Sequence, residues 1–151
     1  MENFETINAI FDFAIESEIE AHKFYTGLAA KASNPEMEKV FIGFAAEEQT
    51  HKEILENARK GRKISLNAEK IPDLKIADFT VAVKPTQNMT YKDALVLAMK
   101  KEKKAFQLYT CLSNLMHNKE DSALFASLAQ QEAKHKLRFE LEYDEVVLKE
   151  D

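Results

Sequence analysis

The sequence contains two copies of one motif, and their spacing limits the folds that the chain can adopt. A glutamate and a histidine three residues apart occur in segment 48–51 (Glu-Gln-Thr-His) and again, at an offset of 84, in segment 132–135 (Glu-Ala-Lys-His). A further glutamate precedes each copy by 30 residues, and a tyrosine follows that glutamate by seven. These residues are Glu18 with Tyr25 and Glu102 with Tyr109. The chain therefore contains an internal repeat of about 44 residues.

Each copy of the motif is suited to binding a metal ion from a helix. Residues three apart lie on the same face of an α-helix, so each motif would direct one carboxylate and one imidazole into a common space. Paired motifs of this kind are typical of carboxylate-bridged di-metal bundles. The midpoints of the two 30-residue spacings fall at the turn signals Ser33-Asn34-Pro35 and His117-Asn118. Each helical hairpin would thus bring its two carboxylates to the same height, about 22 Å from its turn.

The composition agrees with a helical protein. Hydrophobic residues make up 45% of the chain and charged residues 31%, with three Gly and three Pro, which favours an all-α fold. A length of 151 residues suits a single domain over residues 1–151. The formal net charge of −5, with lysines scattered among glutamates, makes nucleic acid an unsuitable partner. Cys111 is alone, no cationic leader is present and no apolar run has membrane length, so we expect a cytoplasmic protein without a membrane partner.

Apolar residues recur with helical spacing in four segments. They predict helices over about 3–32, 35–61, 90–117 and 118–146, with Asn34 and Thr90 as N-caps and fraying beyond Tyr143. Residues 62–89 lose this spacing and contain prolines. A connection of this length, which could include a short strand, suits a crossover along the bundle between two parallel neighbours.

The repeated glutamates lie on the apolar stripes of their helices, so four carboxylates would be buried together. Such a cluster is untenable without cations. Two divalent ions would balance four carboxylates, with His51 and His135 as neutral ligands. This ligand set suits iron or manganese, although zinc could occupy it.

Two neighbouring residues are expected to play lesser roles. His22 shares a helix face with Glu18, but its counterpart in the repeat is Phe106. We therefore expect His22 to be a core residue or a support for the ligands and not a seventh ligand. Glu47, next to Glu48, is expected to face solvent.

These residues resemble the di-iron domain of rubrerythrins, within the ferritin-like superfamily, over nearly the whole chain. The resemblance implies a left-handed four-helix bundle of two hairpins joined by a long crossover, with a centre of two iron ions. It implies that Glu48 and Glu132 bridge the two metals, and that Glu18 with His51, and Glu102 with His135, are terminal ligands. Tyr25 and Tyr109 would donate hydrogen bonds to carboxylates across the bundle. The resemblance also implies a homodimer.

Two features differ from the usual rubrerythrin pattern. Rubrerythrins usually carry a rubredoxin domain with paired Cys-x-x-Cys motifs, whereas Cys111 is the single cysteine here, so we expect electrons from a separate donor such as rubredoxin. They also commonly have a further carboxylate just after the terminal glutamate of the third helix, where this chain has Lys103-Lys104-Ala105-Phe106. The remaining six-ligand set also resembles the ferroxidase centre of bacterioferritins.

The leading functional hypothesis is a non-haem di-iron oxidoreductase that reacts with hydrogen peroxide or dioxygen. The first alternative is a ferroxidase that delivers ferric ion to a mineral store. The second is a structural role, in which zinc neutralises the buried carboxylates. A hydroxylase would also use this kind of site, but no feature of the sequence specifies a pocket for an organic substrate.

Overall fold

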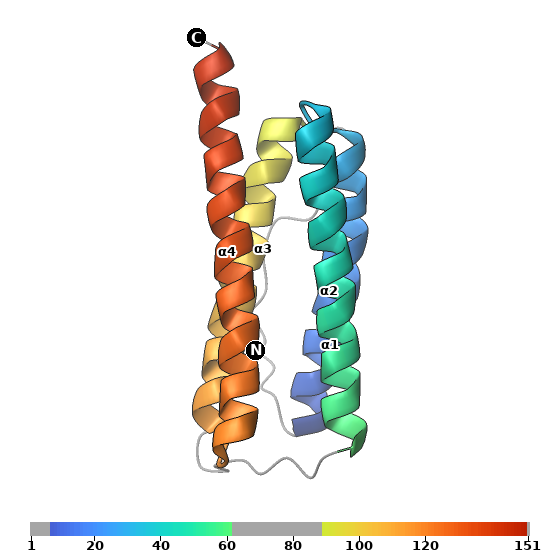
Figure 1. Cartoon of the computed structure of the whole chain (residues 1–151), viewed down its shortest axis with the longest axis vertical. Coiled ribbons are helices and arrows are strands. Elements are labelled where there is room, and N and C mark those ends of the chain that lie inside the picture. Colours follow the sequence, from blue (N-terminus) through green and yellow to red (C-terminus); the bar gives the residue numbers. More distant parts are fainter. Residues whose placement is uncertain (1–6, 62–88, 151) are drawn as a thin grey trace.

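The computed structural model describes residues 7–61 and 89–150, which form four α-helices (Figure 1). The helices are α1 (Ile7–Ala30), α2 (Pro35–Gly61), α3 (Tyr91–Leu115) and α4 (Lys119–Glu150). The predicted all-α fold is confirmed. The predicted start of the first helix at residue 3 lies outside the described residues, as does the predicted crossover over residues 62–89 apart from Met89, with any strand in it. None of the described helices is long and apolar enough to cross a membrane.

Side-chain caps set the beginnings of three helices. Asn34 Oδ1 accepts a hydrogen bond from the backbone N–H of Met37 at 2.9 Å, just ahead of α2. Thr90 Oγ1 accepts one from the N–H of Asp93 at 3.1 Å, ahead of α3. Both predicted N-caps are confirmed. Asn118 Oδ1 does the same for the N–H of Asp121 at 2.8 Å, which starts α4 one residue after the predicted position.

The end of α4 differs from the prediction. The helix continues to Glu150, beyond the predicted end at residue 146, and its last turns extend past the ends of the other helices (Figure 1). The buried carboxylate of Glu142 holds this segment in place, because it accepts hydrogen bonds of 2.6 Å from Ser33 Oγ and Tyr91 Oη. Val146 packs against the core one turn later. Tertiary contacts therefore order a segment that the sequence pattern predicts to fray.

The four helices are arranged as two antiparallel hairpins. α1 packs against α2, α3 packs against α4, and α1 also contacts α3. Side chains of α2 and α4 meet across the bundle at Glu47–His135 and His51–Gln131. α2 and α3 run in the same direction, as Figure 1 shows. The end of α2 and the start of α3 therefore lie at opposite ends of the bundle.

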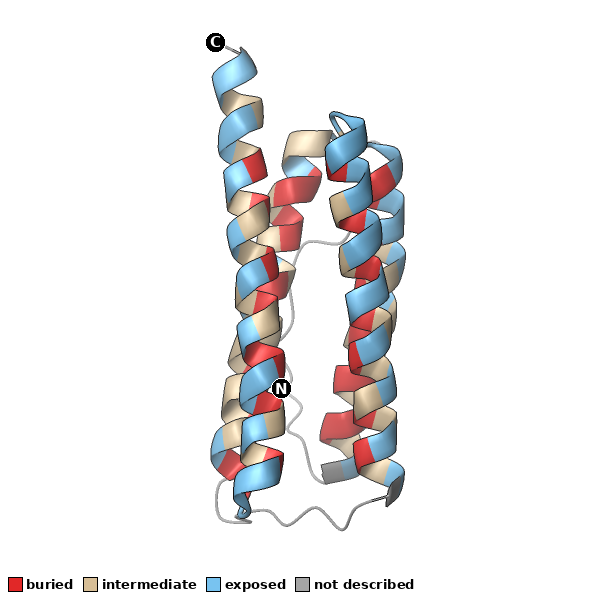
Figure 2. Ribbon diagram, viewed as in Figure 1, coloured by how far each residue is buried: buried red, intermediate tan, exposed pale blue. Residues whose placement is uncertain are grey.

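Two apolar clusters fill the bundle, one on each side of the layer that contains the four repeated glutamates. The lower cluster, near the α3–α4 turn, includes Ile10, Phe11, Leu55, Leu112 and Phe125. The upper cluster, near the α1–α2 turn, includes Tyr25, Leu28, Phe41, Leu95 and Phe139. In Figure 2 the buried residues of the helices face the middle of the bundle. Each helix passes from one cluster to the other through its repeated glutamate, which places these glutamates at mid-bundle.

Candidate metal centre

The polar layer consists of the six side chains that the repeat singles out. All are almost fully buried, with relative exposures between 1% and 3%. α1 and α3 contribute one glutamate each, and α2 and α4 contribute one glutamate and one histidine each. These residues are Glu18, Glu102, Glu48, His51, Glu132 and His135. The two hairpins thus supply equivalent sets, as the repeat predicts.

The six side chains form two overlapping groups, each of a size that suits one metal ion. Glu18 and His51 form the first group with Glu48 and Glu132, and their ligand atoms all lie within 4.8 Å of one another. Glu102 and His135 form the second group with the same two glutamates. Glu48 and Glu132 therefore belong to both groups. This sharing is the geometry that two bridging carboxylates would need.

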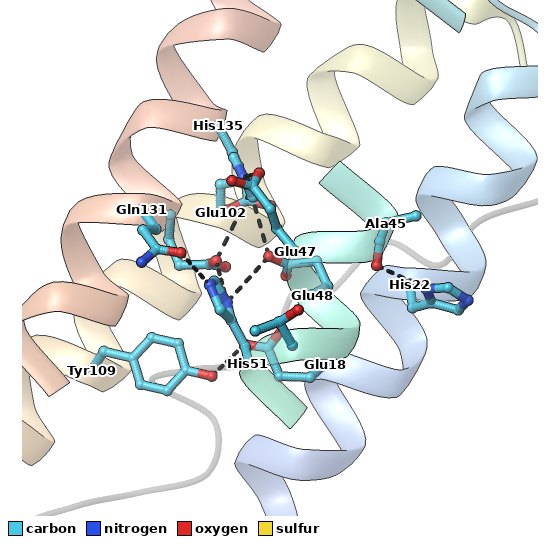
Figure 3. A network of polar contacts seen from close by, with 12 residues as sticks. Glu18, His22, Ala45, Glu47, Glu48, His51, Glu102, Tyr109, Gln131 and His135 are labelled. Atoms are coloured by element: carbon cyan, nitrogen blue, oxygen red, sulfur yellow. Dashed lines mark hydrogen bonds and ion pairs between the residues drawn. The ribbon is translucent and has the colours of Figure 1, made fainter. Parts of the chain in front are cut away.

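The two histidines present the same nitrogen to the layer (Figure 3). His51 Nδ1 lies 3.1 Å from Glu132 Oε1 and 3.4 Å from Glu48 Oε1. His135 Nδ1 lies 3.4 Å from Glu48 Oε1 and 3.7 Å from Glu102 Oε1. In both rings the other nitrogen, Nε2, points away from the layer to a partner outside it. Each imidazole can therefore offer the Nδ1 lone pair to a cation.

Each of the six residues also has one buried polar atom without a hydrogen-bond partner among the described residues. These atoms are Glu18 Oε2, Glu48 Oε1, His51 Nδ1, Glu102 Oε2, Glu132 Oε1 and His135 Nδ1. Buried polar atoms are normally paired, because an unpaired one costs about 1–3 kcal/mol. A set of four carboxylate oxygens and two imidazole nitrogens is the donor chemistry of a di-metal carboxylate site. The residues present therefore fit a pair of divalent cations.

When no metal is bound, protons on the glutamates and histidines compensate part of the negative charge of the polar layer. Burial, and then the neighbouring carboxylates, raise the pKa of Glu48 and of Glu132 well above the usual value. Burial alone would lower the pKa of each histidine, but the close approach and the negative charges of the facing glutamates outweigh it. The pKa of His51 rises to about 9 and that of His135 to about 11. Metal binding near neutral pH must then displace protons from the site.

Tyr25 and Tyr109 each bind the glutamate of the opposite hairpin. The hydroxyl of Tyr25, on α1, donates to Glu102 Oε1 on α3, and that of Tyr109, on α3, donates to Glu18 Oε1 on α1. Burial is the main cause that raises the pKa of both tyrosines well above 10, so they remain donors. In both glutamates the bonded oxygen is Oε1, which leaves Oε2 free to face a cation. The contacts across the bundle thus lie where the resemblance implies them.

His22 lies apart from the polar layer. Its Nδ1 is 2.8 Å from the backbone carbonyl oxygen of Ala45, which ties α1 to α2 (Figure 3). The hydrogen bond links the two helices of one hairpin at a half-buried position. The structure therefore places His22 as a helix–helix contact and brings it to none of the six side chains.

The structure adds two residues to the surroundings of the site. Glu47 is exposed, as expected, but its Oε2 also lies 2.5 Å from His135 Nε2. Gln131 Oε1 lies 2.6 Å from His51 Nε2. A signal for both was present in the repeat, because the offset of 84 pairs Glu47 with Gln131. Each directly precedes a repeated glutamate.

Comparisons with known proteins agree with this arrangement. The sequence model of the rubrerythrin family matches residues 9–143. Among solved structures, a candidate ferritin-like diiron-carboxylate protein from Thermotoga maritima has a TM-score of 0.76 at 22% identity, covering 97% of this chain and 99% of that chain. A hypothetical protein from Pyrococcus furiosus has a TM-score of 0.67 at 27% identity, covering 89% of this chain and 86% of that chain. No curated protein matches the sequence. The predicted ferritin-like four-helix bundle is confirmed.

Proposed function

Because the chain belongs to the rubrerythrin family, we propose that it is a non-haem di-iron oxidoreductase that reduces hydrogen peroxide or dioxygen. This proposal is carried by six buried atoms of the polar layer, one on each candidate ligand, that have no hydrogen-bond partner in the described part of the chain. A buried layer of four carboxylates and two imidazoles does not by itself stabilise the fold, because it places like charges together in a low-dielectric interior. Cation binding is the role that justifies it.

The proposed ligands follow from the two overlapping groups. Glu48 and Glu132 would bridge the two iron ions. Glu18 with His51, and Glu102 with His135, would complete the two coordination spheres. Four carboxylates balance the charge of two divalent ions, and manganese or zinc would satisfy the same donors.

The residues around the ligands orient them and exclude water. Tyr25 and Tyr109 hold one oxygen of each terminal glutamate, so the other oxygen is directed into the layer. The two apolar clusters close the layer from both ends of the bundle. When bound, two iron ions would supply two electrons, which with two protons convert one hydrogen peroxide to two water molecules. These 151 residues hold one cysteine, Cys111, so we propose that electrons reach the site from a separate donor such as rubredoxin.

A ferroxidase is the second candidate, and one observation favours it. The residues that follow Glu102 add no carboxylate to the layer, so the ligand set consists of the six symmetric residues alone within the described part of the chain. A ferroxidase that stores mineral needs a multi-subunit cage, whereas we propose a homodimer for the oxidoreductase. Measurement of the mass in solution would separate the two.

The first test is an aerobic titration of metal-free protein with Fe(II), followed by near-ultraviolet absorbance. We expect a break at about two irons per chain, followed by peroxide-dependent oxidation of the reduced protein. Continued uptake far beyond two would favour iron storage, and no spectral change would favour a structural zinc site. Glu48→Ala and Glu132→Ala should abolish the break with the helices intact. Glu53→Ala, an exposed position on α2, is the matched control.

A further inference from the structure

The outer nitrogens of the two site histidines have chemically different partners. His135 Nε2 is bound by the carboxylate of Glu47, at 2.5 Å. His51 Nε2 is bound by the amide oxygen of Gln131, at 2.6 Å. Both contacts run between α2 and α4, and both are drawn in Figure 3. The two halves of the repeat therefore place a hydrogen-bond acceptor at equivalent positions, but the acceptor is charged in one half and neutral in the other.

Both partners select the same histidine tautomer. A carboxylate oxygen and an amide oxygen are hydrogen-bond acceptors, so Nε2 must carry the hydrogen in each ring. The Nδ1 lone pair is then directed into the polar layer, where Nδ1 of each histidine has no other hydrogen-bond partner among the described residues. Glu47 and Gln131 thus position the two imidazoles as metal ligands.

The difference between the two acceptors affects the strength of each ligand. A carboxylate accepts a stronger hydrogen bond than a neutral amide, and a carboxylate behind a metal-bound histidine raises the basicity of that ligand. The His135 ring is further held by Phe44, which stacks on it with ring centroids 4.1 Å apart. The repeat counterpart of Phe44 is the aliphatic Leu128. Two independent features therefore distinguish the His135 half of the layer from the His51 half.

We propose that Glu47 and Gln131 are positioning residues that make the two metal positions unequal, so that the His135 half binds the first divalent cation. This inference rests on the proposed di-metal site and adds an order of loading to it. Because outer partners of metal-bound histidines typically change affinity by about 10–100-fold, the two binding steps should differ by about tenfold or more.

The test is an anaerobic titration of metal-free protein with Co(II), followed by visible absorption, which reports affinity and ligand geometry without turnover. We expect two Co(II) per chain, bound in two resolved steps. Glu47→Gln should weaken the first step about tenfold and bring the two steps together. Gln131→Glu should strengthen the second step. The double variant E47Q/Q131E should restore two separate steps with the order reversed.

Half-site variants identify which position fills first. His51→Ala retains the His135 half, so its Co(II) spectrum should match that of the first step in the unaltered protein. In the double variant, the first step should instead match the spectrum of His135→Ala. Glu53→Gln, which removes one exposed charge from the same helix, should leave both steps unchanged. This control separates the hydrogen bond from a general charge effect.

The outcomes distinguish the inference from the proposed function. Two Co(II) bound with the same step affinities in the unaltered protein and in E47Q would overturn the inference and leave the di-metal site intact. Binding of fewer than two Co(II) by the unaltered protein would overturn both. Circular dichroism identifies any variant that fails to fold, and Gln131→Glu remains decisive if Glu47→Gln does so.

Discussion

The polar layer and the two apolar clusters occupy one continuous interior, yet they are built on opposite principles. In the clusters, apolar side chains pack on one another, as where Phe41 and Phe139 stack with ring centroids 5.7 Å apart. In the polar layer, six equally buried side chains each keep one atom without a partner among the described residues. The clusters stabilise the bundle by burying apolar surface, whereas the layer places four carboxyl groups together and would gain stability from a bound cation. The residues that stabilise the bundle and the residues of the candidate metal site therefore lie at different heights along it.

The largest effect should come from the apolar side of this comparison. Phe41→Ala removes a fully buried ring from the upper cluster and should lower the free energy of unfolding by about 3–5 kcal/mol, with or without metal. Urea denaturation measures this. The neighbouring Ile42→Ala is the control, because Ile42 is 53% exposed and its loss should cost less than about 0.5 kcal/mol. Loss of stability only in the metal-bound form would contradict the separation.

The next effect should come from the polar layer and depend on metal. Metal in 100-fold excess over its dissociation constant should stabilise the unaltered protein by about 2.7 kcal/mol per site. Glu48→Gln removes one shared carboxylate from both groups and should abolish most of this gain. The metal-free variant should be at least as stable as the unaltered protein, because a neutral amide replaces a carboxyl group whose ionisation is disfavoured by burial and by its neighbours. Thermal unfolding with and without metal measures both, and a less stable metal-free variant would argue against a charge-strained layer.

A smaller effect should follow the loss of one tyrosine hydroxyl. Tyr25→Phe removes the hydrogen bond to Glu102 inside the bundle and should cost about 1–2 kcal/mol and weaken metal binding. Tyr91→Phe removes a similar bond to Glu142, outside the polar layer, where Ser33 still donates to the same carboxylate. It should leave metal affinity unchanged. Equal losses of metal affinity in the two variants would show that the tyrosine contact acts only through the packing of the bundle.

The stability of the metal-free protein should also depend on pH without any substitution. In metal-free protein the pKa of His51 is raised to about 9 and that of His135 to about 11, so the folded state holds these protons more tightly than the unfolded chain. Their contribution is complete below about pH 6.5 and is lost as pH rises through about 9 and then about 11. The raised pKa values of Glu48 and Glu132 act in the same direction. Denaturation of metal-free protein should therefore show stability falling with pH, while metal affinity rises; a rise in metal-free stability would contradict this.

Much of the fold and the site could be predicted because the motif occurs twice with the same spacing, which a chance match would not do. The offset of 84 pairs every residue of the polar layer with a partner of the same type, and turn signals at the midpoints place the layer at mid-bundle. Helix starts at α2 and α3 follow from local capping by Asn34 and Thr90. These features depend on residues close in sequence or on symmetry.

What could not be predicted depends on contacts between distant segments. Glu47 is half exposed, so its position on the helix suggests solvent, and only the approach of α2 to α4 brings it to His135. His22 shares a face with Glu18, yet the packing of α1 on α2 directs it to the Ala45 carbonyl. The last turns of α4 follow from the contacts of Glu142 with Ser33 and Tyr91. Helical periodicity contains no information about such partners.

The shared glutamates also have a kinetic consequence. The first group draws three residues from the α1–α2 hairpin and Glu132 from the other hairpin, and the second group draws Glu48 across in the same way. Neither hairpin alone can therefore complete a four-residue group. Hairpins with short turns form early in folding, and their docking comes later. A metal ion that needs ligands from both hairpins should then lower the rate of unfolding more than it raises the rate of folding.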